Sequence, residues 1–344
     1  MTGHNQSGNG GILSVKRIAI AGAGNMARTR GQAFIETGKA EISSVAARSN
    51  ETARLCAREL NCETYYDDYR RLAELSPDAI LVEVPHKVQD EIAIWALEEG
   101  YDLLIGGCLA SSVEQGEHII EMAEEQGRVI EVGYQRRYDS AWEEIHSVVR
   151  SGNLGEPIMA ASMALWKADP SRWYYDQEQS GGMPLTHMSY GGLNAIRWIL
   201  GNPVNISAMA NQKVETGPGR VLEESCGALV EFESGAFLSA TASYVGPEGM
   251  DSAETRFVFT GGGVQTEPDG AITLFQDGKS ERRSFETSPS PFIRQAKTFL
   301  EAIESRGDGR NPPKDGLVDI RIAEAISLSA REQRSVSMVS GLSG

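Results

Sequence analysis

The sequence predicts a two-domain α/β protein, with a doubly wound parallel sheet in the first domain and an open, mostly antiparallel sheet in the second, α+β domain. Within residues 15–134, short apolar runs alternate with segments compatible with helices, a pattern typical of parallel β-α-β units. Residues 204–285 instead contain successive strand-like runs separated by Gly, Asp and Pro turns, which indicates antiparallel pairing. The 344 residues suffice for two cores of ordinary size.

The first β-α unit carries a glycine motif. An apolar run at 18–21 suits a strand that is buried on both faces, and Gly22-x-Gly24-x-x-Ala27 follows it directly before a helix-compatible segment. Gly22 permits a tight turn, Gly24 leaves room for a pyrophosphate, and Ala27 lets the helix pack on the strand. The free N–H groups at the start of the helix attract phosphates. We therefore predict a Rossmann dinucleotide-binding domain at 15–134, with the cofactor lying against Gly22, Ala23, Gly24, Asn25 and Met26.

Four further strands complete the predicted parallel sheet, at 41–47, 79–84, 102–105 and 128–132, with helices at 49–60, 89–99 and 111–126. Doubly wound sheets bind ligands at the carboxyl ends of their strands. Val84, Pro85 and His86 lie at the end of the strand at 79–84, and Gly106 and Gly107 follow the next strand. We expect these residues to line the cofactor site.

The second domain is predicted to cover 135–344. Helices are expected at 140–151, 182–200, 291–306 and 317–334, and strands at 157–166, 204–208, 225–233, 237–243, 254–260 and 272–275. Helices cover one face of an open sheet of this kind. The other face is often used for self-association, so we expect a homo-oligomer, a dimer or a tetramer, formed through the C-terminal sheet.

Composition and charge exclude several functional classes. The formal net charge of −16 argues against nucleic acid or an anionic membrane surface as a partner. No apolar run reaches the roughly 20 residues of a membrane span, and residues 1–14, rich in Gly, Asn and Ser, are typical of a flexible tail rather than of a signal peptide. The four cysteines have neither CxxC nor zinc-ligand spacing, so we expect a cytoplasmic protein with reduced thiols and no metal site.

The end of the second strand indicates which nicotinamide cofactor is bound. An acidic residue there accepts hydrogen bonds from the ribose 2′-hydroxyl and repels a 2′-phosphate. This sequence has Ala47 at that place, followed by Arg48 and Ser49. The guanidinium of Arg48 can pair with a 2′-phosphate, and the Ser49 hydroxyl adds a neutral donor. We predict a preference for NADP(H), with NAD(H) as the alternative.

Four segments together resemble the Gfo/Idh/MocA family (glucose–fructose oxidoreductase, inositol 2-dehydrogenase and rhizopine catabolism). They are the glycine motif, Val84-Pro85, the run GYQRRYD at 133–139, and Gly181-Gly182 ahead of a helix that ends in RWILG at 197–201. The resemblance covers nearly all of the chain after residue 14. It implies hydride transfer between a nicotinamide and a ring carbon that bears a hydroxyl, in a sugar, a cyclitol or a related polyol.

The chain departs from the family at both positions that carry its proton relay. Members usually have Glu-Lys-Pro after the fourth strand, where this sequence has Gly106-Gly107-Cys108. They have Asp and then His on the central helix, where this sequence has His187 and Gly191. In the family, the lysine and the histidine polarise the hydroxyl and move its proton. The usual relay is therefore absent here.

Three functional hypotheses follow. In the first, an oxidoreductase uses a rebuilt relay: His187 titrates near neutrality, Tyr190 would share its face of an α-helix, and Lys167 leaves the strand before that helix. Substrate contacts are then expected from Trp166, Tyr244 and Arg136. In the second, Thr186-His187 resembles the signature of NAD-dependent glycoside hydrolases of this fold, which oxidise a ring carbon transiently to allow elimination. In the third, the protein binds the cofactor without catalysing a reaction.

Overall fold

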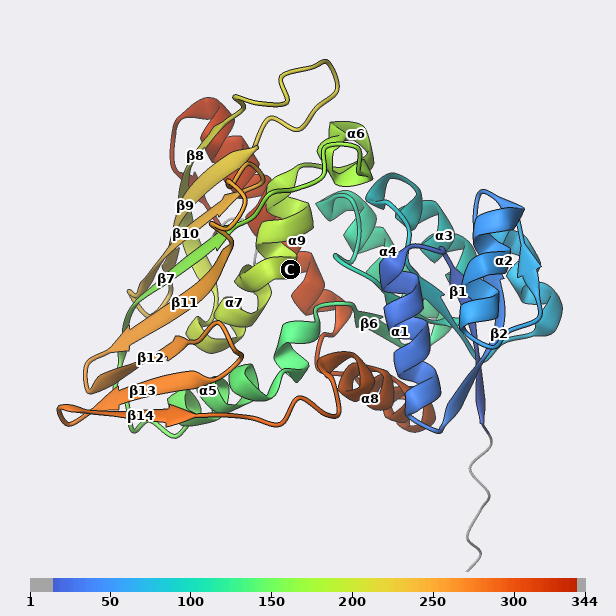
Figure 1. Ribbon diagram of the computed structural model, residues 1–344, viewed down its shortest axis with the longest axis horizontal. Coiled ribbons are helices and arrows are strands. Elements are labelled where there is room, and N and C mark those ends of the chain that lie inside the picture. The colour runs from blue at the N-terminus through green and yellow to red at the C-terminus, as the bar shows by residue number, and fades with distance from the viewer. Residues whose placement is uncertain (1–14, 339–344) are drawn as a thin grey trace, which may run out of the picture.

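Two sheets with their helices form the molecule in the computed structural model, which describes residues 15–338 (Figure 1). The predicted tail at 1–14 lies outside the described residues. The N-terminal sheet has six strands in the order β3-β2-β1-β4-β5-β6, and every neighbouring pair is parallel. This is the doubly wound topology that the sequence predicts.

The N-terminal sheet carries helices on both faces, and its central strands are buried on both faces, as strands of parallel sheets are. Its elements are β1 Lys16–Ala21, α1 Asn25–Glu36, β2 Ala40–Ala46, α2 Asn50–Glu59, β3 Tyr65–Tyr66, the 3₁₀-helix η1 Tyr69–Leu75, β4 Ala79–Val82, α3 His86–Glu98, β5 Asp102–Ile105, α4 Val113–Gln126 and β6 Ile130–Val132. The helix expected at 89–99 begins three residues earlier, at His86, directly after Pro85, which has no N–H to leave unsatisfied at the start of a helix.

The C-terminal sheet has nine strands in the order β14-β13-β12-β11-β7-β10-β9-β8-β15, and only β7 and β10 pair in parallel among them. Its strands are β7 Pro157–Leu165, β8 Pro203–Asn211, β9 Ser225–Phe232, β10 Phe237–Ser243, β11 Ser252–Phe259, β12 Gly262–Thr266, β13 Ile272–Gln276, β14 Lys279–Arg283 and β15 Val336–Ser337. The helices are η2 Gln135–Tyr138, α5 Ser140–Arg150, η3 Trp173–Tyr175, α6 Gln177–Ser180, η4 Pro184–Leu193, α7 Asn194–Leu200, α8 Pro291–Ser305 and α9 Pro313–Glu332.

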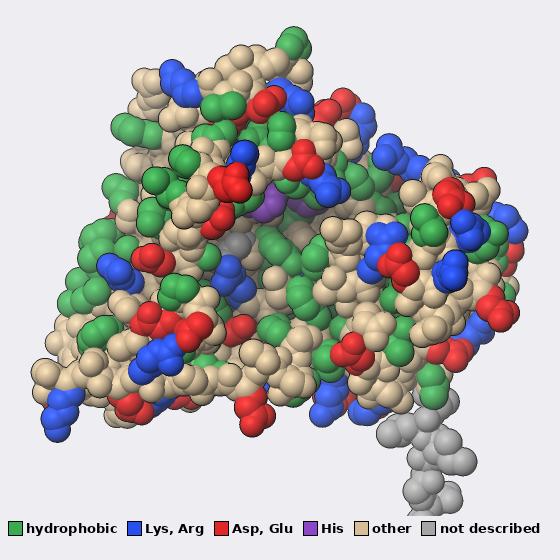
Figure 2. Space-filling view, in the orientation of Figure 1, with side chains coloured by type: hydrophobic (Ala, Val, Ile, Leu, Met, Phe, Trp, Pro, Cys, Tyr) green, Lys and Arg blue, Asp and Glu red, His purple; other side chains and the backbone are tan. Residues whose placement is uncertain are grey.

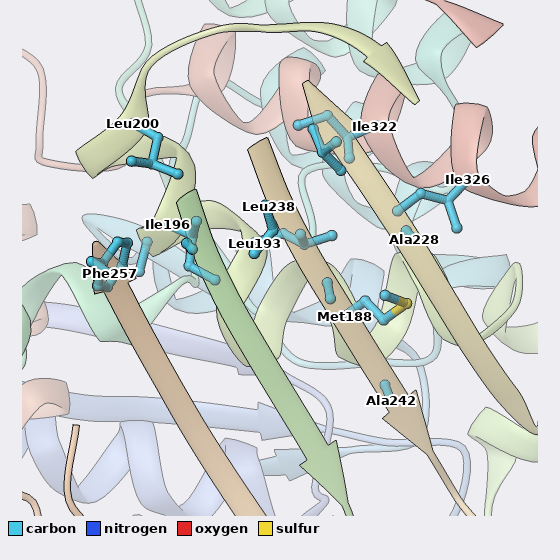
Figure 3. Packing of buried hydrophobic residues seen from close by; sticks show 14 of the residues in the cluster. Met188, Leu193, Ile196, Leu200, Ala228, Leu238, Ala242, Phe257, Ile322 and Ile326 are labelled. Carbon is cyan, nitrogen blue, oxygen red and sulfur yellow. The ribbon is translucent and has the colours of Figure 1, made fainter. Parts of the chain in front are cut away.

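Helices cover one face of this sheet. The central helix consists of η4 and α7, and it packs on the strands together with α9 (Figure 3). The packed helix side chains are Met188, Leu193, Ile196, Leu200, Ile322 and Ile326, and they lie over Ala228, Leu238, Ala242 and Phe257 of the strands. The helix expected at 182–200 is not uniform: η4 is a π-helix, and α7 continues it as an α-helix. The packing fixes the central helix on the sheet, so the side chains on its other faces have defined positions.

The opposite face of the C-terminal sheet carries large apolar side chains in solvent. Five of its strands present Met209, Leu229, Phe237, Val258 and Phe275, whose exposed fractions range from 83 % for Met209 to 40 % for Phe275. Side chains alternate between the faces of a strand, and their neighbours Ala228, Leu238 and Phe257 are buried on the covered face. Among the described elements, all the helices of this half lie on the other side (Figure 1).

Helix α8 joins the two halves. It follows β14 of the C-terminal sheet in sequence but packs against α1, with the ring of Phe299 in edge-to-face contact with Phe34 at 6.1 Å between centroids. Ala296 and Leu300 enter the same buried cluster as Ile18 and Ile20 of β1. The two sheets are therefore held in one arrangement by packing as well as by the chain between them.

No helix within residues 15–338 combines the length and the apolar character needed to cross a membrane. The same residues contain no group of three or more His, Cys, Asp or Glu side chains placed to hold a metal ion. All four cysteines are buried and unpaired.

Candidate functional site

The turn between β1 and α1 is shaped for a dinucleotide. Gly22 has φ +122°, and a Cβ there would lie 2.0 Å from the carbonyl oxygen of Glu83, so only glycine fits. Gly24 differs: it has φ −77°, and nothing lies within 4 Å of a Cβ built on it. The protein itself therefore does not require glycine at 24, and the open space suits a ligand close to the backbone. No side chain caps α1, and its first turn has no acidic residue, which leaves its N–H groups for phosphates.

The other residues predicted in this loop lie where a cofactor can reach them. Asn25 is exposed, Ala23 and Met26 are half-buried, and Ala27 is fully buried under the sheet. The residues at 22–27 thus fit a pyrophosphate group.

The end of β2 presents an unpaired cation. Arg48 is exposed, and within residues 15–338 it makes no hydrogen bond, ion pair or ring contact. Ala47 before it carries no carboxylate, and Ser49 caps α2 by accepting a hydrogen bond of 3.4 Å from the Thr52 N–H. The guanidinium is free for an anionic group, and the Ser49 hydroxyl, which only accepts in this cap, still has its proton to donate.

The carboxyl ends of β4 and β5 bring His86 over Gly107. Val84 and Pro85 are half-buried, and His86 is buried at the start of α3. Its Nδ1 lies 2.8 Å from the carbonyl oxygen of Ser180, which accepts only, so Nδ1 carries the proton. Nε2 then has the lone pair and lies 3.4 Å from both the Cys108 Sγ and a Cβ built on Gly107. Burial lowers the pKa of His86 to about 4.

Cys108 is an inert thiol by its surroundings. Its side chain is buried, and its Sγ donates to the carbonyl oxygen of Ala110 at 3.1 Å. Burial raises the pKa of Cys108 well above the usual range for cysteine. The thiol therefore stays protonated at neutral pH.

His187 on the π-helix is held by a chain of hydroxyl groups. Its Nδ1 lies 2.7 Å from the Tyr244 Oη, which lies 3.0 Å from the Thr186 Oγ1. Thr186 in turn donates to the carbonyl oxygen of Gly182 at 2.9 Å. We assign the donors in that order, from the Nδ1–H of His187 to Tyr244 to Thr186 to the carbonyl. This assignment leaves the lone pair of His187 on Nε2.

The same surroundings keep His187 neutral. Burial, with a smaller contribution from the nearby His86, lowers the pKa of His187 to about 4. The rings of Trp166 and Tyr174 lie 5.2 Å and 4.9 Å from its ring, centroid to centroid. At neutral pH the side chain is therefore an imidazole with a fixed tautomer, which can accept a proton at Nε2.

A groove runs beside His187. His187 and Arg136 line it together with Ser162 and Thr255, whose hydroxyls lie 3.2 Å apart. Figure 2 shows histidine side chains (purple) at a hollow between the two halves of the molecule. His187 and Arg136, both expected at the site, thus line the same groove.

Three predicted residues have other positions than expected. Tyr244, expected to contact substrate, is only 1 % exposed, so it supports His187 from behind. Tyr190 was expected on the face of His187, but hydrogen bonds in a π-helix run from i to i+5 rather than i+4. Its ring instead lies 6.3 Å from that of Tyr134. Lys167 is exposed and follows Trp166 in an extended segment, so it points away from the side on which Trp166 meets His187.

Sequence reasoning missed Tyr174 and gave neither Thr186 nor Trp173 a supporting role. Thr186 and Tyr174 contact His187, and Trp173 packs edge-to-face on His86 with 5.1 Å between centroids. Their roles depend on side-chain direction, which residue type does not reveal. The sequence does carry a signal for Glu83, because this charged residue interrupts an apolar strand end, AILVEV.

Comparison with known proteins agrees with this geometry. Residues 16–134 match the oxidoreductase family with an NAD-binding Rossmann fold, and residues 142–265 match the GFO/IDH/MocA C-terminal domain. The scyllo-inositol 2-dehydrogenase (NAD(+)) of Bacillus subtilis is 27% identical over 210 residues, which are 58% of each chain. The D-xylose 1-dehydrogenase (NADP(+)) 2 of Haloferax volcanii is 22% identical over 317 residues, 88% of this chain and 94% of that one.

A solved structure shares the whole architecture. The aldose-aldose oxidoreductase from Caulobacter crescentus, complexed with glycerol, superposes with a TM-score of 0.84 at 23% identity, over 94% of this chain and 99% of that one. Together the two family matches cover most of the chain. The chain therefore belongs to the Gfo/Idh/MocA family of NAD(P)-dependent oxidoreductases.

Proposed function

We propose that the protein is an NADP(H)-dependent oxidoreductase that acts on a hydroxyl or carbonyl of a sugar, a cyclitol or a related polyol, with His187 as its proton acceptor and donor. The observation that carries the proposal is the hydrogen-bonded chain from His187 through Tyr244 to Thr186 beside the groove. These hydrogen bonds leave His187 as a neutral imidazole whose Nε2 is available to a ligand in the groove.

The chemistry requires such a group. When a hydroxyl-bearing carbon loses hydride, its oxygen must lose a proton, and the C–O bond becomes a carbonyl. The nicotinamide, when bound, supplies the acceptor for that hydride. His187 Nε2 accepts the hydroxyl proton, and the Nδ1–H stays hydrogen-bonded to Tyr244 so that the charge gained is stabilised. In the reverse direction, the protonated His187 returns the proton to the oxygen of the carbonyl.

The substrate class rests on the groove and on the relatives. Ser162 and Thr255 offer hydroxyls to a polyhydroxylated ligand, and Arg136 offers a guanidinium. The names of the relatives refer to inositol and xylose, both rich in hydroxyls. A sugar or a cyclitol is the ligand that matches these donors and acceptors.

Arg48 supports the choice of NADP(H). Its guanidinium has no partner within the described chain, and it follows the end of β2, the strand end at which this fold recognises the ribose 2′ position. One full-length relative carries NADP(+) in its name and another relative carries NAD(+), so the family accommodates both.

We further propose a homo-oligomer, a dimer or a tetramer, formed by the outer face of the C-terminal sheet. The apolar side chains Met209, Leu229, Phe237, Val258 and Phe275 spread over five strands of that face. Such a patch suits a second copy of itself. The unpaired cysteines fit a cytoplasmic location.

A panel of free polyols and aryl glycosides tests the function. Absorbance at 340 nm with NADP⁺ should rise with at least one free polyol. Release of the aglycone without net reduction would instead establish the redox-assisted hydrolase, the alternative that Thr186-His187 raises. Tight cofactor binding with no turnover of either class would establish a binding protein. Thr186 bonds to Gly182 and Tyr244, which accounts for it without the hydrolase.

A further inference from the structure

A carboxylate from β4 fills the space beside Gly106 at the end of β5. A Cβ built on Gly106 would lie 2.2 Å from the carboxyl carbon of Glu83. Glu83 continues β4 by donating its N–H to the carbonyl oxygen of Ala21 at 2.7 Å, and its side chain reaches across to the neighbouring strand. Glycine at 106 is thus matched to a carboxylate that comes from another strand.

Arg30 holds that carboxylate in place. The Arg30 Nε lies 2.6 Å from the Glu83 Oε1, and the Arg30 side chain is only 2 % exposed. Arg30 also donates to the carbonyl oxygen of Gly133 and to the Oε1 of Gln295. Burial raises the pKa of Glu83, and the positive charge of Arg30 opposes that shift. Glu83 is therefore a fixed, charge-paired acceptor, with 10 % of its side chain still exposed.

The position of Glu83 in the sheet decides which half of a dinucleotide it can meet. Its carbonyl oxygen contacts Gly22, so Glu83 lies directly beside the glycine loop. In the sheet, β4 and β5 lie on one side of β1. β2 lies on the other side of β1, and Arg48 follows β2. The pyrophosphate of a dinucleotide binds at the glycine loop, so its two nucleosides extend to opposite sides. Arg48 faces the adenosine side, and Glu83 faces the other.

We propose that Glu83, oriented by Arg30, binds the nicotinamide nucleoside by accepting hydrogen bonds from its ribose hydroxyls. The Glu83 carboxylate does so from the space that a side chain at residue 106 would occupy. The inference rests on the proposed function, because it requires a nicotinamide dinucleotide as the cofactor. Ribose hydroxyls are donors, and a charge-paired carboxylate is a strong acceptor for them.

Calorimetric titration with two ligands tests the role of Glu83. NADP⁺ has both halves, whereas adenosine 2′,5′-bisphosphate has only the adenosine half. The Glu83→Gln variant should bind NADP⁺ about tenfold or more weakly, the loss expected for a hydrogen bond to a charged acceptor. It should bind the bisphosphate within about twofold of the wild type. The matched control Arg48→Ala should weaken both ligands.

The same experiment also reports whether the variants are folded. Unaltered binding of the bisphosphate reports an intact glycine loop, and the double variant Arg30→Gln/Glu83→Gln avoids leaving an unpaired buried charge. The proposal is overturned if both Glu83 variants bind NADP⁺ like the wild type, or if they lose both ligands equally. In either case, NADP⁺ binding by the wild type leaves the proposed cofactor intact, whereas a wild type that binds no dinucleotide refutes the cofactor as well.

Discussion

Replacing Tyr244 with Phe removes a single hydroxyl and should slow turnover without weakening substrate binding. The ring would keep its contacts with Trp166 and Tyr175, whose centroids lie 5.2 Å and 5.1 Å away. The hydroxyl lies 2.7 Å from the His187 Nδ1 and is its shortest hydrogen bond. Without this acceptor, the tautomer with the proton on Nε2 becomes populated, and that form cannot accept a proton from substrate.

The structure sets the size of the effect. A buried hydrogen bond contributes about 0.5–1.5 kcal/mol, and more when one partner is charged. Thr186 Oγ1 lies 3.1 Å from Nδ1 and remains as a weaker acceptor. We therefore expect Tyr244→Phe to reduce kcat about tenfold, equivalent to about 1.4 kcal/mol. The double variant Tyr244→Phe/Thr186→Val should lose about a hundredfold, because no acceptor is left for Nδ1.

Steady-state kinetics on the polyol that the wild type oxidises best would measure both constants. Because Tyr244 is buried behind His187, KM should stay within about twofold of the wild type. An unchanged kcat with a large rise in KM would refute the reasoning, since it would mean that Tyr244 contacts substrate directly. Unchanged values of both constants would mean that the tautomer of His187 is set by something else.

Three further predictions concern the cofactor, the assembly and pH. Arg48→Ala should weaken NADP⁺ binding about tenfold or more but change NAD⁺ binding by less than about twofold, and equal losses by calorimetry would refute the NADP(H) assignment. Leu229→Glu should convert the oligomer into monomers in light scattering, whereas the same change at exposed Leu222, outside the sheet, should not. His86 and His187 have folded-state pKa values of about 4, below the unfolded value of about 6.5, so the unfolded chain binds more protons in acid. The free energy of unfolding should therefore fall between pH 6.5 and 4 by up to about 1.4 kcal/mol per pH unit for each histidine. In chemical denaturation, His187→Gln should show a shallower fall of this free energy with pH. The same fall in the variant and the wild type would contradict a lowered pKa for His187.

The N-terminal half could be predicted from the sequence because its signals are local. Apolar runs such as Ala79–Val82 are buried on both faces, and the glycine motif lies between strand and helix as expected. The C-terminal half was predicted less completely. Strand β14, Lys279–Arg283, was missed because it has no apolar residue and pairs only at the edge of the sheet. β14 forms by pairing with β13, so its own residues do not reveal that it is a strand.

The candidate site depended on directions that a one-dimensional pattern does not contain. His187 could be identified from its place on the central helix, but nothing in the sequence of 184–193 marks the π-helix that separates it from Tyr190. Arg30 and Glu83 are far apart in the sequence, and charged residues near a loop usually lie in solvent. Their pairing depends on the neighbouring strands β1 and β4. Only the fold brings them together.

The most direct test of the account is single-turnover oxidation of a polyol by His187→Gln with NADP⁺ at saturation, followed at 340 nm. Removing the proton acceptor should lower the rate about 10²- to 10⁴-fold, while calorimetry should give an unchanged affinity for NADP⁺. A rate close to that of the wild type would contradict the account, because the hydroxyl proton would then leave by a route that does not involve His187.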